Sequence, residues 1–578
     1  MKNNSTQQKT SLIQSFKKMW PLLAAEKKAV FIAVGATLLN AVLSLVGPLG
    51  IGYTIDHYII PKDLHGTLLA TGVLLAVFIV AFVVNYIQMR VMGGVTQRTL
   101  WRLRNDIFSK LQNLSLSFFN QYKSGDLISR INSDTEKINQ FFSQGLLRFV
   151  GNVFMTAGAG IFIIFINPKL AGAALVPGVV ILIFSQAVSK WVGRVNKEHL
   201  TQEGLLSGEI QESIANFKVV VAFNRRDYFR TRFAQVNTNN YKASIKAGIA
   251  NELFTPVFEW MGNIAQIIVL GYGIYLVGTG QFALGLLVSF VIYVTRFYDP
   301  LREMARLWAS LQTALAAWDR VSAILNQPPE LERVALEKAD GKGLVEFKKV
   351  GFSYPNGVQV LKDVSFVFEK GKTYALVGPT GGGKTTTASL IARLYDPNEG
   401  TIYLDGKDIR SYEPSERTRK IGFILQEPVL FVGTIGENLF YGNPKYADLE
   451  KEEVENVLKD KGLTPLLDVF PQGVSTRIEG STLSLGQKQI IAFMRAVLRE
   501  PDLLILDEAT ANIDTVTEKV LEDILNKLPK DTTRVIIAHR LNTIANADDI
   551  FFVNNTHVIE AGSMEHAVEM LLHGKRKS

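Results

Sequence analysis

The chain has 578 residues, of which 47% are apolar, 20% are charged and none is cysteine. Soluble domains carry about a quarter charged residues, so this composition indicates that part of the chain lies in lipid, and it excludes a disordered, collagen-like or disulfide-stabilised protein. Thiolate metal sites and cysteine nucleophiles are excluded as well. The formal net charge of +8 indicates either a nucleic-acid partner or basic loops beside a membrane, and its distribution along the chain decides between them.

The apolar residues are concentrated before residue 300, in stretches almost free of charge. Because about 20 residues cross a bilayer core, the long block from Trp260 to Thr295 must hold two spans, with a turn at Gly278–Gly280. Buried soluble helices are the alternative, which the number of uncharged stretches disfavours. We therefore predict six membrane helices, at residues 29–52, 66–89, 149–168, 170–189, 254–277 and 281–297.

Lysine and arginine are distributed unevenly between the segments that connect these spans. Residues 90–148 carry nine and residues 190–253 carry ten, whereas residues 53–65 and 167–169 carry one each. Basic loops stay on the cytoplasmic side, so we predict a multi-pass protein of the cell (inner) membrane with both termini cytoplasmic. No base-stacking module accompanies the charge, so nucleic acid is not an expected partner.

Both basic segments have a helical pattern. In RTLWRLRNDIFSKLQNL (98–114) apolar residues recur at intervals of three and four, which predicts that the membrane helices continue as rods into the cytosol. Gly125 and Gly208 are the expected turns at the rod tips. The predicted domains are a membrane domain at residues 1–325, a charged, proline-containing linker at 326–343 and a soluble domain at 344–578.

A phosphate-binding motif follows the strand-like run Thr373–Val377. The segment GPTGGGKTT matches G-x-x-x-x-G-K-[ST], in which glycines let backbone N–H groups close around phosphate oxygens at a helix N-terminus. Lys384 is expected to reach the β- and γ-phosphates, and the Thr385 hydroxyl to hold Mg²⁺. A plain glycine turn is the alternative, which the strand–loop–helix context disfavours. The nucleotide-binding candidates here are Gly378, Pro379, Thr380, Gly381, Gly382, Gly383, Lys384, Thr385 and Thr386.

A second apolar strand, Leu503–Glu508, ends in two carboxylates. Ligands bind at the carboxyl ends of parallel strands. Asp507 is therefore the expected partner of Mg²⁺, through water, and Glu508 is placed to accept a proton from the water that attacks the γ-phosphate. Such a strand end is a weak signal alone, and a specific one beside a phosphate loop.

The segment STLSLGQKQIIAFMRAVLREPDLLILDEATANID (481–514) resembles the signature region of ATP-binding-cassette (ABC) transporters. The segment FFNQYKSGDLISRINSD (118–134) is similar to the first cytoplasmic loop of exporter-type half-transporters, so the resemblance covers nearly the whole chain. It implies an all-α membrane domain of six helices with long cytoplasmic extensions, fused to an α/β P-loop nucleotide-binding domain. It also implies ATP and Mg²⁺ as cofactors.

The resemblance implies roles for further residues. Tyr354 matches the aromatic that stacks on adenine, Gln426 the glutamine that senses Mg²⁺ and the attacking water, and His539 the γ-phosphate switch. Tyr354 could instead be an ordinary strand aromatic, and His539 a satisfied polar residue at a strand end. Ser484, Gly486 and Gln487 match the signature that closes over the partner subunit's ATP, and Asp514 matches the loop between the two sites. The catalytic candidates are Glu508, His539 and Gln426, and the metal candidates are Thr385, Gln426 and Asp507.

Because the resemblance places each ATP between one subunit's phosphate loop and the other's signature, it implies a dimer. The expected activity is ATP hydrolysis coupled to export or flipping of an amphipathic drug, lipid or peptide by alternating access. Two alternatives stay open: import of a metal chelate by an exporter-like fold, and an ATP-gated channel or regulator. The expected partners are a second half-transporter, the lipid bilayer and a hydrophobic or amphipathic substrate.

Two residues raise further questions. The family signature is usually L-S-G-G-Q, whereas this chain has LSLGQ, with Leu485 at a position suited to glycine. The catalytic motifs of the same chain are intact, which favours a heterodimer over a symmetric dimer that tolerates the change. Glu259, just inside the fifth predicted span, either faces a cavity as a functional group or lies at the membrane interface.

Overall fold

The computed structural model forms two compact units, one built from residues 1–112 and 125–326 and the other from residues 113–124 and 327–578. A short segment inside the predicted membrane domain therefore groups with the soluble domain. The structure describes residues 19–328, 331, 333–335, 341–355, 357–443, 445–446, 451–478, 483–507, 515–537 and 547–573.

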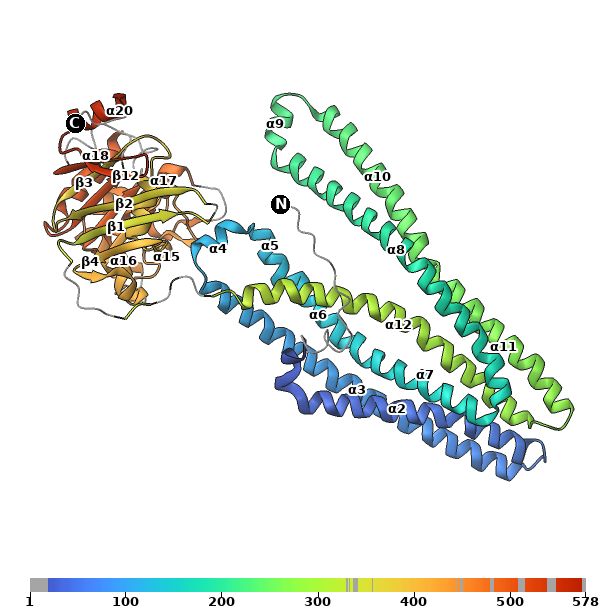
Figure 1. The fold of residues 1–578 in the computed structure, drawn as a ribbon. Coiled ribbons are helices and arrows are strands. Elements are labelled where there is room, and N and C mark those ends of the chain that lie inside the picture. Colours follow the sequence, from blue (N-terminus) through green and yellow to red (C-terminus); the bar gives the residue numbers. More distant parts are fainter. Residues whose placement is uncertain are drawn as a thin grey trace. The chain divides into compact units, whose positions relative to one another are not determined.

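Six helical segments of the first unit are long and apolar enough to cross a membrane (Figure 1), which confirms the predicted fold of this part. Their main helices are α2 (Lys27–Thr54), α3 (Leu64–Gln112), α7 (Leu146–Ile166), α8 (Pro168–Ala215), α11 (Phe254–Gly278) and α12 (Leu284–Leu325). Further helices connect them: α4 (Leu116–Gln121), α5 (Ser124–Ser129), α6 (Thr135–Gln140), α9 (Phe217–Ala222) and α10 (Arg226–Glu252).

Helices α8 and α10 run side by side as a long rod that α9 closes at its tip (Figure 1). The carboxylate of the buried Glu209 on α8 forms an ion pair with Arg232 on α10, whose Nε lies 2.8 Å from a carboxylate oxygen. Asn196 and Asn251 exchange two side-chain hydrogen bonds of 2.8 and 3.0 Å across the same pair. These contacts hold the rod together where its surface is polar.

The expected turns at the rod tips are displaced. Gly208 lies inside α8, and the chain turns at Asn216 and at Asn224, which has a φ of +50° that asparagine tolerates. Gly125 lies inside α5, just after a bend at Tyr122. The prediction of turns at these two glycines was wrong: Asn224 takes the positive-φ position at one rod tip, and the bend near the other glycine is at Tyr122.

Two membrane-helix boundaries also differ from the predicted residues. Helix α7 ends at Ile166 because Asn167 is extended and its side chain caps α8, accepting from the N–H groups of Lys169 and Leu170. Helix α12 begins at Leu284, since the turn at Gly280 (φ +71°) continues to Ala283.

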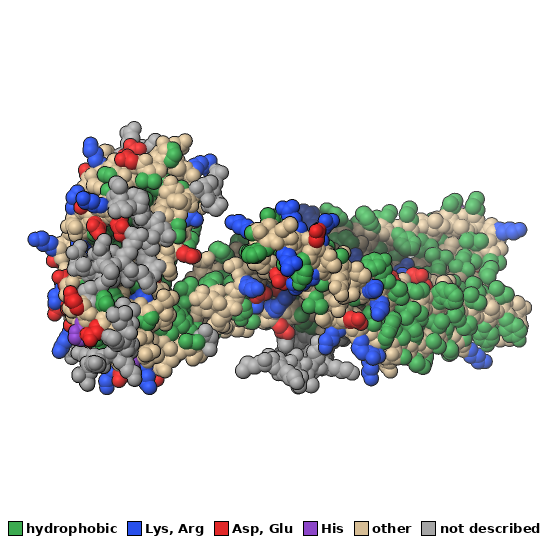
Figure 2. Space-filling model, turned by 90° about the horizontal axis from the view of Figure 1, so that it is seen from above, with side chains coloured by type: hydrophobic (Ala, Val, Ile, Leu, Met, Phe, Trp, Pro, Cys, Tyr) green, Lys and Arg blue, Asp and Glu red, His purple; other side chains and the backbone are tan. Residues whose placement is uncertain are grey.

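Helices α2 and α12 approach closely near one end of the membrane unit. A Cβ on Gly52 would lie 2.5 Å from the carbonyl oxygen of Gly285, so only glycine fits there. Ser289 donates to the carbonyl of Pro48 at 2.7 Å and Tyr293 to that of Leu45. Small residues with interhelical hydrogen bonds are typical of helix packing in lipid. Hydrophobic side chains cover one part of this unit, and lysine and arginine gather on another (Figure 2).

The second unit is built on a six-stranded sheet in the order β12-β11-β3-β10-β9-β6, with β12 antiparallel at one edge and the remaining neighbours parallel. Strands β3, β9 and β10 are almost entirely buried, as their continuous apolar sequences predict for a parallel sheet. The strands are β3 (Thr373–Val377), β6 (Ile421–Ile424), β9 (Leu503–Asp507), β10 (Thr533–Ile537), β11 (Asp549–Asn554) and β12 (His557–Glu560).

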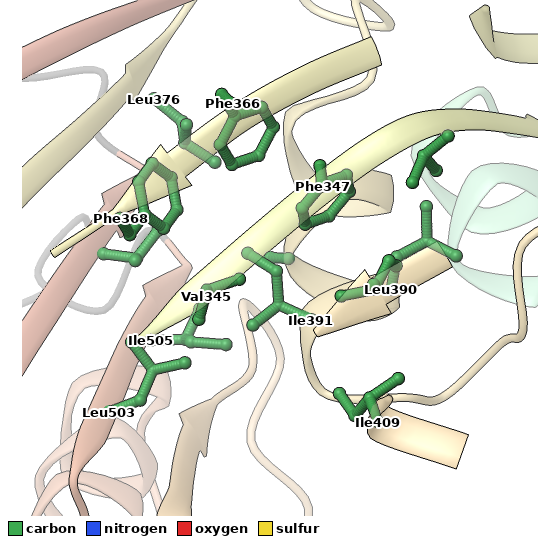
Figure 3. Close-up of a cluster of buried hydrophobic side chains, with 14 of the residues drawn as sticks. Val345, Phe347, Phe366, Phe368, Leu376, Leu390, Ile391, Ile409, Leu503 and Ile505 are labelled. Atoms are coloured by element: carbon green, nitrogen blue, oxygen red, sulfur yellow. The ribbon is translucent and has the colours of Figure 1, made fainter. Parts of the chain in front are cut away.

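An antiparallel sheet in the order β2-β1-β4-β5 packs against this one. Phe347 and Phe366 stack with ring centroids 4.4 Å apart, and Leu503 and Ile505 of β9 belong to the same buried cluster (Figure 3). The strands are β1 (Val345–Ser353), β2 (Gln359–Phe368), β4 (Glu399–Leu404) and β5 (Lys407–Asp408), with a small pair β7 (Gly433–Thr434) and β8 (Arg477–Ile478). The helices are α13 (Lys384–Ile391), α14 (Pro414–Lys420), α15 (Ile435–Leu439), α16 (Lys451–Asp460), α17 (Leu485–Val497), α18 (Thr515–Lys527) and α20 (Met564–His573).

Candidate nucleotide-binding site

A glycine-rich loop connects β3 to α13. Gly378 has a φ of +148°, and a Cβ there would lie 2.2 Å from the carbonyl oxygen of Val553 on β11. Gly383, the last residue before α13, has a φ of +111°. These conformations require glycine, and they turn the chain sharply enough to leave the start of α13 facing the loop.

Lys384 is the first residue of α13 and is almost fully buried, with 6% of its surface exposed. Its ammonium donates to the carbonyl oxygens of Gly378 at 2.8 Å and Pro379 at 3.1 Å. The loop therefore holds the positive charge of this lysine on its inner side, next to the N-terminus of α13. The lysine charge and the helix N-terminus both favour the binding of an anion.

Thr385 and Asp507 meet across the sheet, because β10 pairs with both β3 and β9. The Thr385 hydroxyl lies 3.4 Å from a carboxylate oxygen of Asp507, whose side chain is buried at the end of β9. A hydroxyl and a carboxylate are hard oxygen donors of the kind that Mg²⁺ takes together with phosphate oxygens and water. The residues present therefore fit the expected metal.

A cavity of about 380 Å³ opens over the loop. It brings together the predicted Tyr354 on the antiparallel sheet side, the phosphate loop and Gln426 after β6. The Tyr354 hydroxyl lies 3.0 Å from that of Thr386. Sequence reasoning missed Val358 and Val360 in the lining, because no local pattern sets these two valines apart from other strand residues. The lining residues are Tyr354, Val358, Val360, Thr380, Gly381, Gly383, Lys384, Thr385, Thr386 and Gln426.

Tyr354 belongs to an aromatic cluster that reaches α4. Its ring lies 5.5 Å from that of Tyr395, and Phe352 contacts both. Asn120 of α4 donates to the Tyr395 hydroxyl at 2.7 Å. Both residues belong to the second unit, which includes residues 113–124. The hydrogen bond joins residues 275 apart in the chain, and no local pattern could have indicated it.

The predicted signature residues lie at the start of α17. Ser484 caps this helix: its hydroxyl accepts from the Gln487 N–H at 3.2 Å, and the Gln487 side chain accepts from the Ser484 N–H at 2.9 Å. Leu485 and Gly486 form the first helical turn, and Leu485 is 40% exposed. Among the described residues, those that line the 380 Å³ cavity include none of this segment.

Three predicted residues lie outside the described part of the chain: Glu508, Asp514 and His539. Glu508 follows β9 and His539 lies two residues after β10, and these two strands are parallel neighbours in the sheet.

Family comparisons agree with this arrangement. The family model described as "ABC transporter transmembrane region" matches residues 30–301, and a second model, described as "ABC transporter", matches residues 361–511. The chain belongs to the ABC transporter family. Its six-helix membrane unit and single nucleotide-binding domain make it an exporter-type half-transporter, and it hydrolyses ATP to drive transport.

Relatives in this family match along most of the chain. The chain is 33% identical to the ABC transporter ATP-binding protein YfiC of Bacillus subtilis, over 96% of this chain and 92% of the relative. It is 33% identical to a "Fatty acid ABC transporter ATP-binding/permease protein" of Mycobacterium bovis, over 85% and 77%. It is 31% identical to the "Probable multidrug resistance ABC transporter ATP-binding/permease protein YheH" of Bacillus subtilis, over 86% and 74%.

Proposed function

We propose that this ABC half-transporter exports an amphipathic substrate as one half of a heterodimer in the cell membrane, with both termini cytoplasmic. The observation that carries the dimer is the separation of the two halves of the ATP site. The described lining of the nucleotide cavity contains the phosphate loop and Gln426 but not the signature at the start of α17. A second chain supplies the missing half. Relatives named for fatty acids and for multidrug resistance support an amphipathic substrate.

We assign roles at the site from the geometry of the described residues and, for Glu508 and His539, from the family resemblance alone. Lys384 neutralises the phosphates, and Tyr354 stacks on the adenine. Thr385 and Asp507 hold Mg²⁺, with Gln426 beside them; the ion supplies further charge neutralisation when bound. Glu508 accepts the proton of the attacking water and His539 senses the γ-phosphate.

Leu485 supports a heterodimer over a symmetric dimer. It begins α17 in helical conformation with 40% of its surface exposed, so the fold of this chain does not require glycine there. Any requirement for glycine comes from outside the chain, where the signature approaches the nucleotide of the partner. This chain therefore provides a complete catalytic half and an altered signature, and the competent site pairs its phosphate loop with an intact partner signature.

Leu485→Gly is accordingly expected to change the ATPase rate of the assembled pair by less than about threefold, because it alters only the slow site. The measurement is steady-state ATP hydrolysis by this chain alone and by this chain with a half-transporter that carries L-S-G-G-Q. The melting temperature of each variant is measured as well, so that damage to the start of α17 is separated from an effect on hydrolysis. Robust hydrolysis by the chain alone, or a large gain from Leu485→Gly, contradicts the heterodimer.

Helix α4 is the proposed route by which ATP binding reaches the membrane helices. It lies between α3 and α5 in the chain, and its Asn120 contacts Tyr395, which in turn contacts Tyr354 at the adenine end of the cavity. Closure of the two nucleotide-binding domains on ATP moves this contact, and α3 and α5 transmit the motion to the membrane helices. Coupling of this kind works because ATP and substrate prefer different states.

Asn120→Ala is expected to lower transport per ATP hydrolysed by a few-fold, since one neutral hydrogen bond contributes about 1 kcal/mol. ATP affinity is expected to stay unchanged. Tyr395→Phe removes the same bond and keeps the ring, so it should give the same result, whereas Gln121→Ala on the exposed side of α4 should not. The prediction fails if both variants keep the wild-type ratio of transport to hydrolysis.

ATP-dependent uptake into inside-out vesicles tests the proposed function. Only in such vesicles does added ATP reach a cytoplasmic nucleotide-binding domain. Accumulation of an amphipathic substrate against its gradient supports export. Loss of preloaded substrate indicates import, and ATP-dependent equilibration without accumulation indicates a channel or regulator.

A further inference from the structure

Helices α11 and α12 present matching polar faces to each other inside an apolar unit. The polar residues recur at intervals of four and three on each helix, which places them on one helical face. The two helices are joined by a short turn and pack side by side in antiparallel directions (Figure 1). The polar residues are Glu259, Asn263 and Gln266 on α11 and Thr295, Asp299 and Arg302 on α12.

These residues extend from the middle of the span toward the end remote from the turn. At 1.5 Å per residue, Gln266 and Thr295 lie about 17 Å from the turn that joins the helices, near the middle of a bilayer core about 30 Å thick. The Gln266 amide donates to the Thr295 hydroxyl at 2.8 Å. Glu259 and Arg302 form an ion pair near the far boundary. Polar groups at such depths face protein or a water-filled path rather than lipid.

A cavity of about 190 Å³ lies between the two polar faces. Phe258, Gly262 and Tyr298 complete its lining. Tyr298 is buried, and its hydroxyl donates to the carbonyl of Ala174 on α8 at 2.7 Å, which fixes the ring as one wall. Gly262 packs against this tyrosine without a side chain of its own, which leaves room beside the ring.

The cavity has a surplus of negative charge. Its two carboxylates, Glu259 and Asp299, share one guanidinium: Arg302 donates to Glu259 and has its other terminal nitrogen 3.9 Å from Asp299. Both acids remain at least half exposed. The nearby Glu303 does not line the cavity and is paired with Arg148 of α7 at 3.7 Å.

We propose that this cavity binds the head group of an amphipathic organic cation, a protonated amine or quaternary ammonium, as the substrate of the transporter. The inference rests on the proposed export function and names its substrate class. The volume suits a head group with a few carbons, since whole drug-sized ligands occupy about 300–1,000 Å³. The surplus carboxylate supplies the charge, and the faces of Phe258 and Tyr298 supply cation–π contacts.

Substitution of Arg302 should change the affinity for the cation in the direction opposite to substitution of Glu259. Arg302 competes with a cationic ligand for the same carboxylates, so Arg302→Gln should raise the affinity for the cation, whereas Glu259→Gln should lower it. If the Glu259–Arg302 pair only ties α11 to α12, both variants weaken the structure and act in the same direction. Opposite signs therefore separate a binding site from a structural ion pair.

The experiment measures equilibrium binding to the assembled transporter in lipid nanodiscs without ATP. The probes are a dansyl-labelled decyltrimethylammonium and its neutral tert-butyl isostere. The cation should bind at least about tenfold more tightly than the isostere, and Glu259→Gln or Asp299→Asn should each weaken it about tenfold, the equivalent of 1.4 kcal/mol. Arg302→Gln should strengthen binding several-fold, and the matched Glu303→Gln should leave it unchanged.

Equal affinities of the wild-type protein for the cation and its isostere overturn the proposal, and this comparison needs no variant to fold. A loss of cation binding in Arg302→Gln as large as in Glu259→Gln, at unchanged melting temperature, also overturns it. Failure of the export function would give a different result: no amphiphile, charged or neutral, would accumulate in vesicles. Export of neutral amphiphiles without preference for the cation overturns only this inference.

Discussion

Glu508→Gln is expected to lower ATP hydrolysis by the assembled transporter about 10²–10⁴-fold while ATP still binds. Glutamine keeps the size and hydrogen-bonding capacity of the side chain but cannot accept the proton of the attacking water. Asp507, the preceding residue, lies buried at the end of β9, with a carboxylate oxygen 3.4 Å from the Thr385 hydroxyl. Hydrolysis rate and binding of a fluorescent ATP analogue are measured together.

Glu522→Gln, on the exposed side of α18, is the matched control and should leave the rate unchanged. In the proposed heterodimer this chain holds the general base of the only fast site, so a single substitution should remove nearly all turnover. A residual rate near one half would show that the partner has an equally active site and would contradict the asymmetry.

Lys384→Ala is expected to weaken ATP binding by about 100-fold or more, because hydrogen bonds to charged groups contribute about 1.5–3 kcal/mol each. In the structure its ammonium lies 2.8 Å from the carbonyl of Gly378 and 3.1 Å from that of Pro379, inside the loop that is to receive the phosphates. Equilibrium binding of the nucleotide analogue in the presence of Mg²⁺ measures the loss.

Lys372→Ala provides the comparison, since this lysine lies beside the other end of β3 and pairs with Glu369 on the surface at 2.6 Å. Its removal should change ATP affinity by less than about twofold, because an ion pair on the surface contributes little to stability or binding. Unchanged ATP affinity in Lys384→Ala, with the melting temperature preserved, would contradict the proposal that this loop binds the phosphates of ATP.

Signals carried by neighbouring residues predicted the fold well. Uncharged runs of about 20 residues identified the six membrane helices, because lipid excludes charge over a fixed length. The continuous apolar runs before the phosphate loop and before Glu508 identified β3 and β9. The rod turns were predicted incorrectly: Gly208 continues a helix, and Asn216 and Asn224 make the turns.

Contacts between segments that are distant in the chain could not be predicted from the sequence. The phosphate loop is a local motif, whereas the place of Tyr354 and Gln426 beside it depends on how two sheets pack. The link from Asn120 to Tyr395 depends on α4 joining the second unit. Glu259 stood out as an acid inside a span, but its pairing with Arg302 emerges only from the antiparallel packing of α11 and α12.

The most direct test of the central claim is uptake of an amphipathic substrate by inside-out vesicles that contain this chain and a half-transporter with an intact signature. We predict that the substrate accumulates inside the vesicles when ATP and Mg²⁺ are added, and that Glu508→Gln in this chain abolishes the accumulation. ATP-dependent loss of substrate from preloaded vesicles, or equilibration without accumulation, would contradict an exporter.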